Sequence, residues 1–477
     1  MVMYMQNKRR IKIIQEAMGN SSDIVVREVN DNLAYIYLES VSSDDKISNF
    51  LLKSIVQCNN VKDLLKQLQK NIYNSHIELI KKFDDVYYYL ASGYTCLFID
   101  SEESFIVIET KASLDRSIAE STSEPLIRGP KDSFTENNAS NLGLIRKRIK
   151  DPKLRIDELK IGRRTNSKVS IIYIDDIAEK KNVDTIKQAL NKINIDAVLD
   201  TGYVRDYLET KEKSLFPKMI STERPDLCCQ GILNGKIAVM VENSPYVLVM
   251  PAILTDFFKN PEDYYLKFTS STFSRVIKFI AFLITILTPA LYIALMTFNQ
   301  EMIPDQLIIS LATQRSQVPF PTFMEVIIFV IIFEILREAD MKSPSASGAS
   351  MSIVGALILG DAAVSASIVS PFVIIVVAIT SICELVFTDM DFINAIRHWR
   401  LLFIFSTIFT GIVGIVVAGL ILVIKLASLE PLNTPYLIPF SPFNLSGMKD
   451  NILLFPTNKR FRRPDYLTKN TKKGAKA

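Results

Sequence analysis

Hydrophobic and polar residues are distributed differently in the two halves of this chain. Up to about residue 275, short apolar runs alternate with charged and turn-forming residues, and beyond it long apolar runs dominate. The first pattern predicts an α/β N-terminal region, and the second predicts an α-helical, multi-span membrane domain. Charged residues return at the end of the chain.

Within the first half, apolar residues at helical spacing predict helices over 8–18, 44–57 and 61–83. Short apolar runs bounded by turn residues predict strands over 24–29, 33–38, 94–100 and 105–109.

One strand pair of this half recurs later in the chain. Gly93-Tyr-Thr-Cys-Leu-Phe-Ile-Asp followed by Phe105-Ile-Val-Ile resembles Gly235-Lys-Ile-Ala-Val-Met-Val-Glu followed by Tyr246-Val-Leu-Val. Tyr35-Ile-Tyr-Leu-Glu likewise resembles Ile171-Ile-Tyr-Ile-Asp. We expect two related α/β subdomains that arose by duplication; chance similarity of two short hairpins is the alternative.

These patterns suggest five regions. They are a first α/β subdomain (1–115), a basic linker with a helix (116–164), a second α/β subdomain (165–265), a transmembrane helical domain (276–428) and a basic cytoplasmic tail (429–477). The cations of the linker either form a solvated face or contact anionic headgroups or a partner subunit; they are Arg146, Lys147, Arg148, Lys150, Lys153 and Arg155.

The second half contains five candidate membrane segments. Phe279–Phe298 is long enough to cross a bilayer, Met324–Leu336 is short, and Leu401–Ile424 reads as a final span. Ser350–Val369 and Phe372–Phe387 form either a tight hairpin or two halves of a broken helix. Residues 299–318 fit an interfacial helix. We expect helix breaks at four prolines, Pro289, Pro319, Pro321 and Pro371.

Charge placement predicts the membrane orientation. No apolar signal sequence follows the basic residues at the N-terminus, and the tail is rich in Lys and Arg. We therefore expect both termini in the cytoplasm and an even number of crossings, so that one of the five candidates would be re-entrant.

Several ionisable residues fall inside the apolar half. A charge at membrane depth costs roughly 2.5–3.5 kcal/mol on insertion scales, so such residues usually face a bundle interior or a water-filled path. A neighbouring run of small residues, from Ser343 to Ser370, would let helices approach closely. The resulting candidates for a pore or gate are Glu325, Glu334, Arg337, Glu338, Ser352, Gly355, Leu359 and Asp361.

Composition argues against several other functions. The net charge is +4, and no aromatic and basic platform suggests a nucleic-acid partner. The five cysteines show no metal-ligand spacing, and the two histidines are isolated. We find no phosphate-binding glycine loop and no catalytic motif. We therefore predict no enzyme activity, cofactor or metal.

Motifs spread along most of the chain resemble the A subunits of the GerA family of spore germinant receptors. They are Glu124-Pro-Leu-Ile-Arg-Gly-Pro-Lys-Asp-Ser-Phe-Thr-Glu136, Ile161-Gly-Arg-Arg-Thr165, Tyr173-Ile-Asp175, Glu223-Arg-Pro-Asp226, Asn260-Pro-Glu-Asp-Tyr-Tyr265, Pro319-Phe-Pro-Thr322, Glu334-Ile-Leu-Arg-Glu-Ala339, Ser352-Ile-Val-Gly355 and Ile368-Val-Ser-Pro-Phe372. The specificity lies in their order and spacing.

This resemblance implies an A subunit in the spore inner membrane that works with a transporter-like B subunit and a lipoprotein C subunit. It also implies a homo-oligomer that forms a ligand-gated ion channel and starts germination in response to nutrients. The germinant pocket would belong to the B-type partner.

The chain departs from the family pattern where Ala356 replaces a glycine, where Asp361 replaces a neutral residue, and where Asp340 replaces a glycine. A ring of Asp361 carboxylates would favour cations; the alternative is that Asp361 sits at an interface and pairs with another subunit or with Lys342. The alternative functions are that of a stage V sporulation AF-like protein assisting dipicolinate release, or that of a secondary transporter, whose folds usually show about ten spans with membrane repeats.

Overall fold

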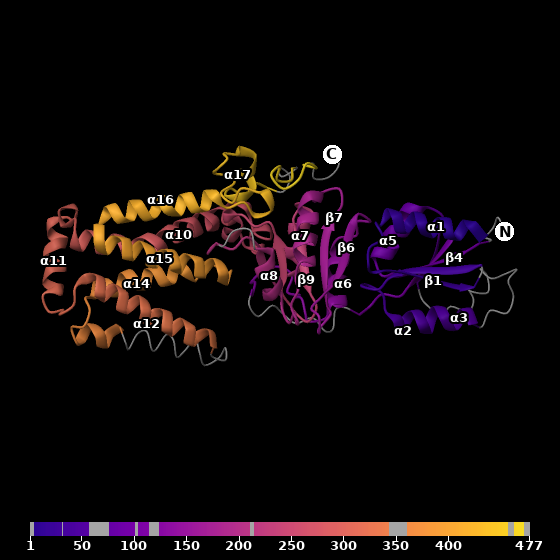
Figure 1. The fold of residues 1–477 in the computed structure, drawn as a ribbon, viewed down its shortest axis with the longest axis horizontal. Helices are drawn as coiled ribbons and strands as arrows, with labels where there is room; N and C mark the ends of the chain where they lie inside the picture. Colours follow the sequence, from indigo (N-terminus) through magenta and orange to yellow (C-terminus); the bar gives the residue numbers. More distant parts are fainter. Residues whose placement is uncertain are drawn as a thin grey trace.

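The computed structural model describes residues 4–30, 32–56, 76–100, 104–113, 124–209, 214–342, 360–456 and 462–471. Figure 1 shows three parts in a row: an α/β unit with the N-terminus, a second α/β unit in the middle, and a bundle of long helices at the other end. We call these the first unit, the middle unit and the bundle.

The first unit is built on an antiparallel sheet of order β1-β2-β4-β5-β3. Alternate residues of its central strands are buried on opposite faces: Ile36 and Phe98 pack against α1 and α5, whereas Tyr35 and Leu97 pack beneath residues 47–51. Burial on both faces explains why these strands read as continuous apolar runs. The elements are α1 (Tyr4–Ala17), β1 (Ile24–Asn30), β2 (Leu33–Leu38), α2 (Asp44–Lys46), a π-helical turn (Ile47–Leu52), α3 (Lys53–Val56), β3 (Ile77–Ile80), α5 (Phe83–Ala91), β4 (Tyr94–Ile99) and β5 (Phe105–Glu109).

The middle unit repeats this plan with the sheet order β6-β7-β9-β10-β8. Its hairpin β9–β10 therefore takes the place of β4–β5, and β7 takes the place of β2. This match in position accompanies the sequence repeat that suggested a duplication. The elements are α6 (Asn138–Arg148), β6 (Leu154–Ile161), β7 (Ser167–Ile174), α7 (Lys180–Asn191), α8 (Thr201–Leu208), β8 (Ile220–Thr222), α9 (Pro225–Leu233), β9 (Ile237–Val241) and β10 (Val247–Met250).

Two expectations for the α/β half require correction. The helix expected over 61–83 does not extend to its end, because Ile77–Ile80 pairs with β5 as the edge strand β3; residues 57–75 lie outside the described part of the chain. The expected linker contains β6, which pairs with β7 along its length. Periodicity alone does not distinguish so short an edge strand from a helical turn.

A buried ion pair joins the first unit to the middle unit. Arg146 of α6 is fully buried, and its Nε and Nη2 atoms lie 3.0 and 2.9 Å from the two carboxylate oxygens of Asp23. Burial alone would raise the pKa of Asp23, but the charge of Arg146 and hydrogen bonds from Arg146, Ser40 and Ser21 lower it below its usual value. Arg146 thus does not belong to a solvated basic face.

Long helices form the bundle, and α10, with 30 residues, is the longest that the structure describes. Among the described residues, α10 alone is long and apolar enough to cross a membrane, while α14 and α16 are apolar but shorter. The elements that lead into and form this part are η3 (Leu254–Phe258), η4 (Pro261–Tyr264), α10 (Phe268–Thr297), η5 (Gln300–Met302), α11 (Asp305–Arg315), α12 (Thr322–Lys342), α14 (Pro371–Glu384), α15 (Met390–Thr410), α16 (Ile412–Ser428), η6 (Pro431–Asn433) and α17 (Leu445–Asn451).

Helices α12 and α14 run in the same direction. At their first turns, the Ser370 N–H donates to Glu325 Oε2 at 2.8 Å, and at their last turns Arg337 pairs with Glu384.

The predicted final span over 401–424 is in fact two helices. Gly411 ends α15 and begins α16 with φ +62° and ψ −136°, a conformation open essentially to glycine alone. Pro289 lies inside α10, which continues through it; a bundle tolerates such a proline when neighbouring groups satisfy the freed carbonyl. The expectation of a break at Pro289 is therefore wrong.

We expect Gly411→Ala to destabilise the bundle by about 2–4 kcal/mol, from backbone strain together with a clash. A Cβ atom at this position would lie 2.8 Å from Phe298 Cγ. Gly419→Ala is the matched control, since its nearest contact would be 4.0 Å away. Thermal unfolding of the detergent-solubilised chain would measure both, and equal melting temperatures would contradict the prediction.

The C-terminal segment, residues 429–456 and 462–471 of the described chain, packs on the middle unit. Arg463 Nε donates to the Leu233 carbonyl at 2.8 Å, and Asn470 Nδ2 donates to the Asp176 carbonyl at 3.3 Å. Gly235 lies against Leu467 and Thr468. The middle unit and the C-terminal segment therefore lie on the same side of any membrane that the bundle crosses. Within the basic run of the tail, residues 459–461 lie outside the described part.

Candidate functional site

Five charged side chains meet where α12, α14 and α15 come together, and we call them the charge network. Glu384 of α14 is its centre: Arg397 Nε lies 2.6 Å from Oε1, Arg400 Nη1 lies 3.0 Å from Oε2, and Arg337 also pairs with it. Glu334 pairs with Arg397 and Arg400 from the opposite side. The side chains of Glu384 and Arg400 are each only 4% exposed.

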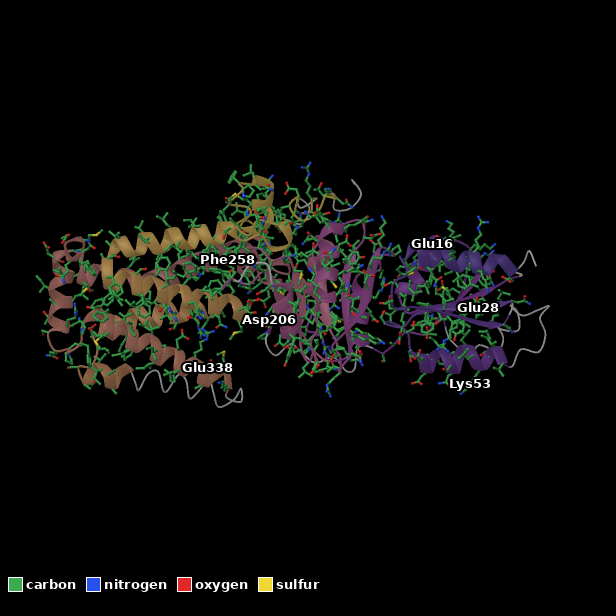
Figure 2. All side chains as sticks on the ribbon, viewed as in Figure 1. Glu16, Glu28, Lys53, Asp206, Phe258 and Glu338 are labelled. Atoms are coloured by element: carbon green, nitrogen blue, oxygen red, sulfur yellow. The ribbon has the colours of Figure 1, made fainter. Side chains whose placement is uncertain are left out.

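Three guanidinium groups and two carboxylates leave this network with one excess positive charge. It lies at the last turns of α12 and α14 and the first turns of α15, so it sits at the end of the bundle that faces the middle unit. Figure 2 labels Glu338 near this end.

The first turn of α15 attaches the bundle to the middle unit. Phe392 stacks on Phe257 at a ring separation of 4.9 Å and contacts Phe216 and Phe258, and Asp391 pairs with Arg205 of α8. Figure 2 labels Phe258 at this junction. One helix thus carries both the attachment to the middle unit and the arginines that hold α12 and α14. A displacement of the middle unit would reach α12 and α14 through α15.

Glu325 lies at the other end of α12. It is fully buried, accepts the hydrogen bond from the backbone of Ser370, and has Arg315 Nε 3.9 Å from its Oε1 atom. It therefore joins the starts of α12 and α14 and is separate from the charge network.

The structure brings only some of the predicted site residues together. Glu334 and Arg337 both belong to the charge network, where each pairs with residues of other helices. Glu338 is exposed and pairs with Lys342 at 2.9 Å, so Lys342 is not the partner of Asp361. Asp361 is exposed and makes no ion pair with any described residue. Ser352, Gly355 and Leu359 lie outside the described residues.

The remaining prolines lie at or near helix starts: Pro321 directly precedes α12, Pro319 lies two residues further upstream, and Pro371 is the first residue of α14.

The sequence patterns did not point to Glu384, the centre of the charge network. Arg397 and Arg400 were not among the predicted site residues either. No local spacing identifies these residues, because their partners lie on other helices.

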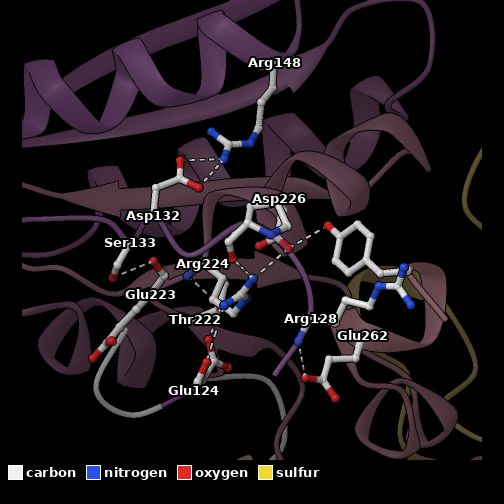
Figure 3. Close-up of polar contacts among 12 residues, drawn as sticks. Glu124, Arg128, Asp132, Ser133, Arg148, Thr222, Glu223, Arg224, Asp226 and Glu262 are labelled. Atoms are coloured by element: carbon white, nitrogen blue, oxygen red, sulfur yellow. Dashed lines mark hydrogen bonds and ion pairs between the residues drawn. The ribbon is translucent and has the colours of Figure 1, made fainter. Parts of the chain in front are cut away.

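A second polar cluster joins three of the motifs noted above (Figure 3). Arg224 is 1% exposed, and its Nη2 donates to the Pro130 carbonyl at 2.8 Å and to Asp226 Oδ2 at 2.9 Å. Thr222 Oγ1 donates to Glu124 Oε2 at 2.6 Å. Glu262, at the entry to the bundle, accepts hydrogen bonds from the backbone of Ile127 and Arg128. These contacts hold the loop 124–130 while Ile127 stays 98% exposed.

Glu124 makes the stability of this cluster depend on pH. Burial raises the pKa of Glu124 to about 7. Because this value exceeds that of an unfolded glutamate, the folded chain binds the proton more tightly. The contribution of protonated Glu124 to the free energy of unfolding is complete below about pH 4.5 and is lost as the pH rises through 7.

We therefore expect Glu124→Gln to stabilise the chain relative to the parent at pH 8, by on the order of 2 kcal/mol, and not at pH 4.5. Melting temperatures at the two pH values test this. Exposed Glu136 on the same segment offers the control Glu136→Gln, which should show no such pH-dependent difference. A gain that is the same at both pH values would contradict the assignment.

The chain is similar in sequence to a known protein family and to several known proteins. The chain matches the family described as Bacillus/Clostridium GerA spore germination protein over residues 12–466. Spore germination protein KA of Bacillus subtilis (strain 168) is 34% identical over 473 residues, covering 97% of this chain and 87% of that protein. The uncharacterized membrane protein YfkQ of the same organism is 34% identical over 462 residues, covering 95% and 90%.

A solved structure is also similar, namely the N-terminal domain of the A subunit of the Bacillus megaterium spore germinant receptor GerK3. It is 32% identical with a TM-score of 0.40, and the match covers 51% of this chain and 94% of that one.

The bundle with its apolar helix α10 and the match over nearly the whole length define a membrane-associated spore germination protein. More particularly, the chain belongs to the GerA family of Bacillus/Clostridium spore germination proteins. This confirms the family resemblance of the sequence motifs.

Proposed function

We propose that this chain is the A subunit of a nutrient germinant receptor in the spore inner membrane, where copies of it form a ligand-gated ion channel. It would act with a transporter-like B subunit, which holds the germinant, and a lipoprotein C subunit.

The observation that carries the channel proposal is Asp361. An exposed carboxylate on an apolar, membrane-associated bundle must face water or another subunit, because a lipid-facing charge is costly. Asp361 makes no ion pair with any described residue, and it precedes α14, which runs parallel to α12. Repeated around an oligomer, this carboxylate would line a cation path.

The topology that fits this proposal has both termini in the cytoplasm. Contacts of the C-terminal segment with the middle unit support an even number of crossings. The described helices α10, α12, α14, α15 and α16 would supply five of them.

In this proposal the charge network and the α15 attachment would couple the cytoplasmic units to the pore helices. Opening would shift α15 and thereby move α12 and α14, the second of which follows Asp361 in the chain.

Release of monovalent cations from spores after nutrient addition tests the proposal. Asp361→Asn should slow release at normal protein level, because each subunit would lose a charge on the path. Glu301→Gln removes an exposed carboxylate near the far end of α10 and is the matched control. Parental release from Asp361→Asn spores would remove Asp361 from the path and return it to an interface role.

A further inference from the structure

An apolar cavity of about 220 Å³ lies beside the first turns of α10. Three separate parts of the chain line it: Phe258 of η3, Val276 and Phe279 of α10, and Phe440 and Ile452 of the C-terminal segment. Val276, Phe279 and Phe440 are each more than a third exposed, so the cavity reaches the surface.

The cavity marks the start of the longest apolar run of the bundle. Phe279 lines it and begins the run that continues to Phe298. The surface around it is also apolar, since Phe273 is 67% exposed, Ile280 49% and Phe443 70%. A surface of this kind, continuous with an apolar helix, is expected at the boundary between membrane and cytoplasm.

Buried positive charge lies next to this apolar space. Arg275 lines the cavity and Lys278 follows it by one turn of α10; they are 2% and 3% exposed. Arg275 is held by Asp263, 2.7 Å from its Nε, and by the Asp450 carbonyl, which accepts from its Nη1, whereas Arg275 Nη2 and Lys278 Nζ have no hydrogen-bond partner in the described part of the chain. A buried cation without a partner is costly, and an anionic group would remove that cost.

We propose that this cavity binds an anionic phospholipid, with an acyl chain beside Val276 and Phe279 and the phosphate near Lys278 and Arg275. The inference rests on the proposed placement of α10 in the membrane. A phospholipid is favoured because it combines an apolar chain with a negative charge. Free phosphate lacks an apolar acyl chain. A second copy of the protein would have to supply an apolar group and a negative charge at the same place.

Thermal unfolding of the purified full-length chain in dodecyl maltoside tests the site. Dioleoylphosphatidylglycerol should raise the melting temperature saturably, by roughly 2–4 °C or more, and dioleoylphosphatidylcholine should raise it less. Val276→Trp, which fills the cavity, should abolish the response to both lipids. Lys278→Gln should remove the preference for phosphatidylglycerol and keep the response to phosphatidylcholine.

Ile280→Trp is the matched control, because Ile280 lies on the same helix, is exposed and does not line the cavity. It should respond like the parent. An unchanged response in both Val276→Trp and Lys278→Gln, or a doubling of the molecular mass in place of lipid binding, would overturn the inference. Membrane fractionation separates this from the proposed function: a chain absent from the membrane fraction refutes membrane placement, whereas a membrane-bound chain without lipid preference refutes only the lipid site.

Discussion

Replacing Glu384 with glutamine is expected to destabilise the bundle by about 3–5 kcal/mol, the range observed when one partner of a buried ion pair is removed. The substitution keeps the shape of the side chain but leaves three guanidinium groups facing one carboxylate. The largest effect is expected at Arg400, because it is 4% exposed, loses the Glu384 carboxylate from its Nη1, and already has no hydrogen-bond partner for its Nε atom among the described residues. Melting temperature in detergent and nutrient-triggered cation release are the two readouts.

Two further variants distinguish this effect from a general loss of charge. Glu338→Gln removes a carboxylate from the same end of the bundle, but Glu338 and its partner Lys342 are more than half exposed. The Glu338→Gln substitution is therefore expected to lower the free energy of unfolding by less than about 1 kcal/mol. The double variant Arg337→Gln with Glu384→Gln restores the original charge excess and should recover part of the stability. The network would lose its assigned role if Glu384→Gln melted at the temperature of Glu338→Gln.

Asp23→Ala is the second large effect that we expect. It leaves Arg146 buried without its carboxylate at the joint between the first and middle units, which costs about 3–5 kcal/mol. The separation of the two units should also make the chain between them more sensitive to proteases. Melting temperature and limited proteolysis of the full-length chain would record the two consequences.

The double variant Asp23→Ala with Arg146→Met should be more stable than Asp23→Ala alone, because it removes both buried charges. Glu16→Ala is the control: Glu16 and Lys12 form an exposed pair on α1 at 3.8 Å, and its loss should cost less than about 0.5 kcal/mol. A cost for Asp23→Ala as small as that of Glu16→Ala would show that the pair does not hold the two units together.

Local patterns in the sequence were sufficient to predict several features of the fold and the family. The change from short to long apolar runs separated the α/β units from the helical bundle, and the repeated hairpin pointed to two sheets of the same strand order. Motif order identified the family. These features depend on residue spacing within one element, or on composition over many residues, and both can be read without knowing what packs on what.

Other features depended on partners that are far apart in the sequence. Pairing with β5 made residues 77–80 a strand, although their spacing also suited a helix. Gly411 looked like one of several small residues for close packing, yet it is the turn that divides one apolar run into two helices.

By itself, then, the sequence determined the division into α/β units and an apolar bundle, the repeated hairpin and the family. Only the tertiary structure decided which charges meet. Contacts between separate elements join Glu384 to Arg400 and Asp23 to Arg146. Glu334 and Arg337, by contrast, lie one turn apart on one helix, and each pairs with residues of other helices. The reason is physical: a buried charge is stabilised by whichever opposite charge the packing brings within a few ångströms, and sequence spacing constrains that distance only within a single helix or strand.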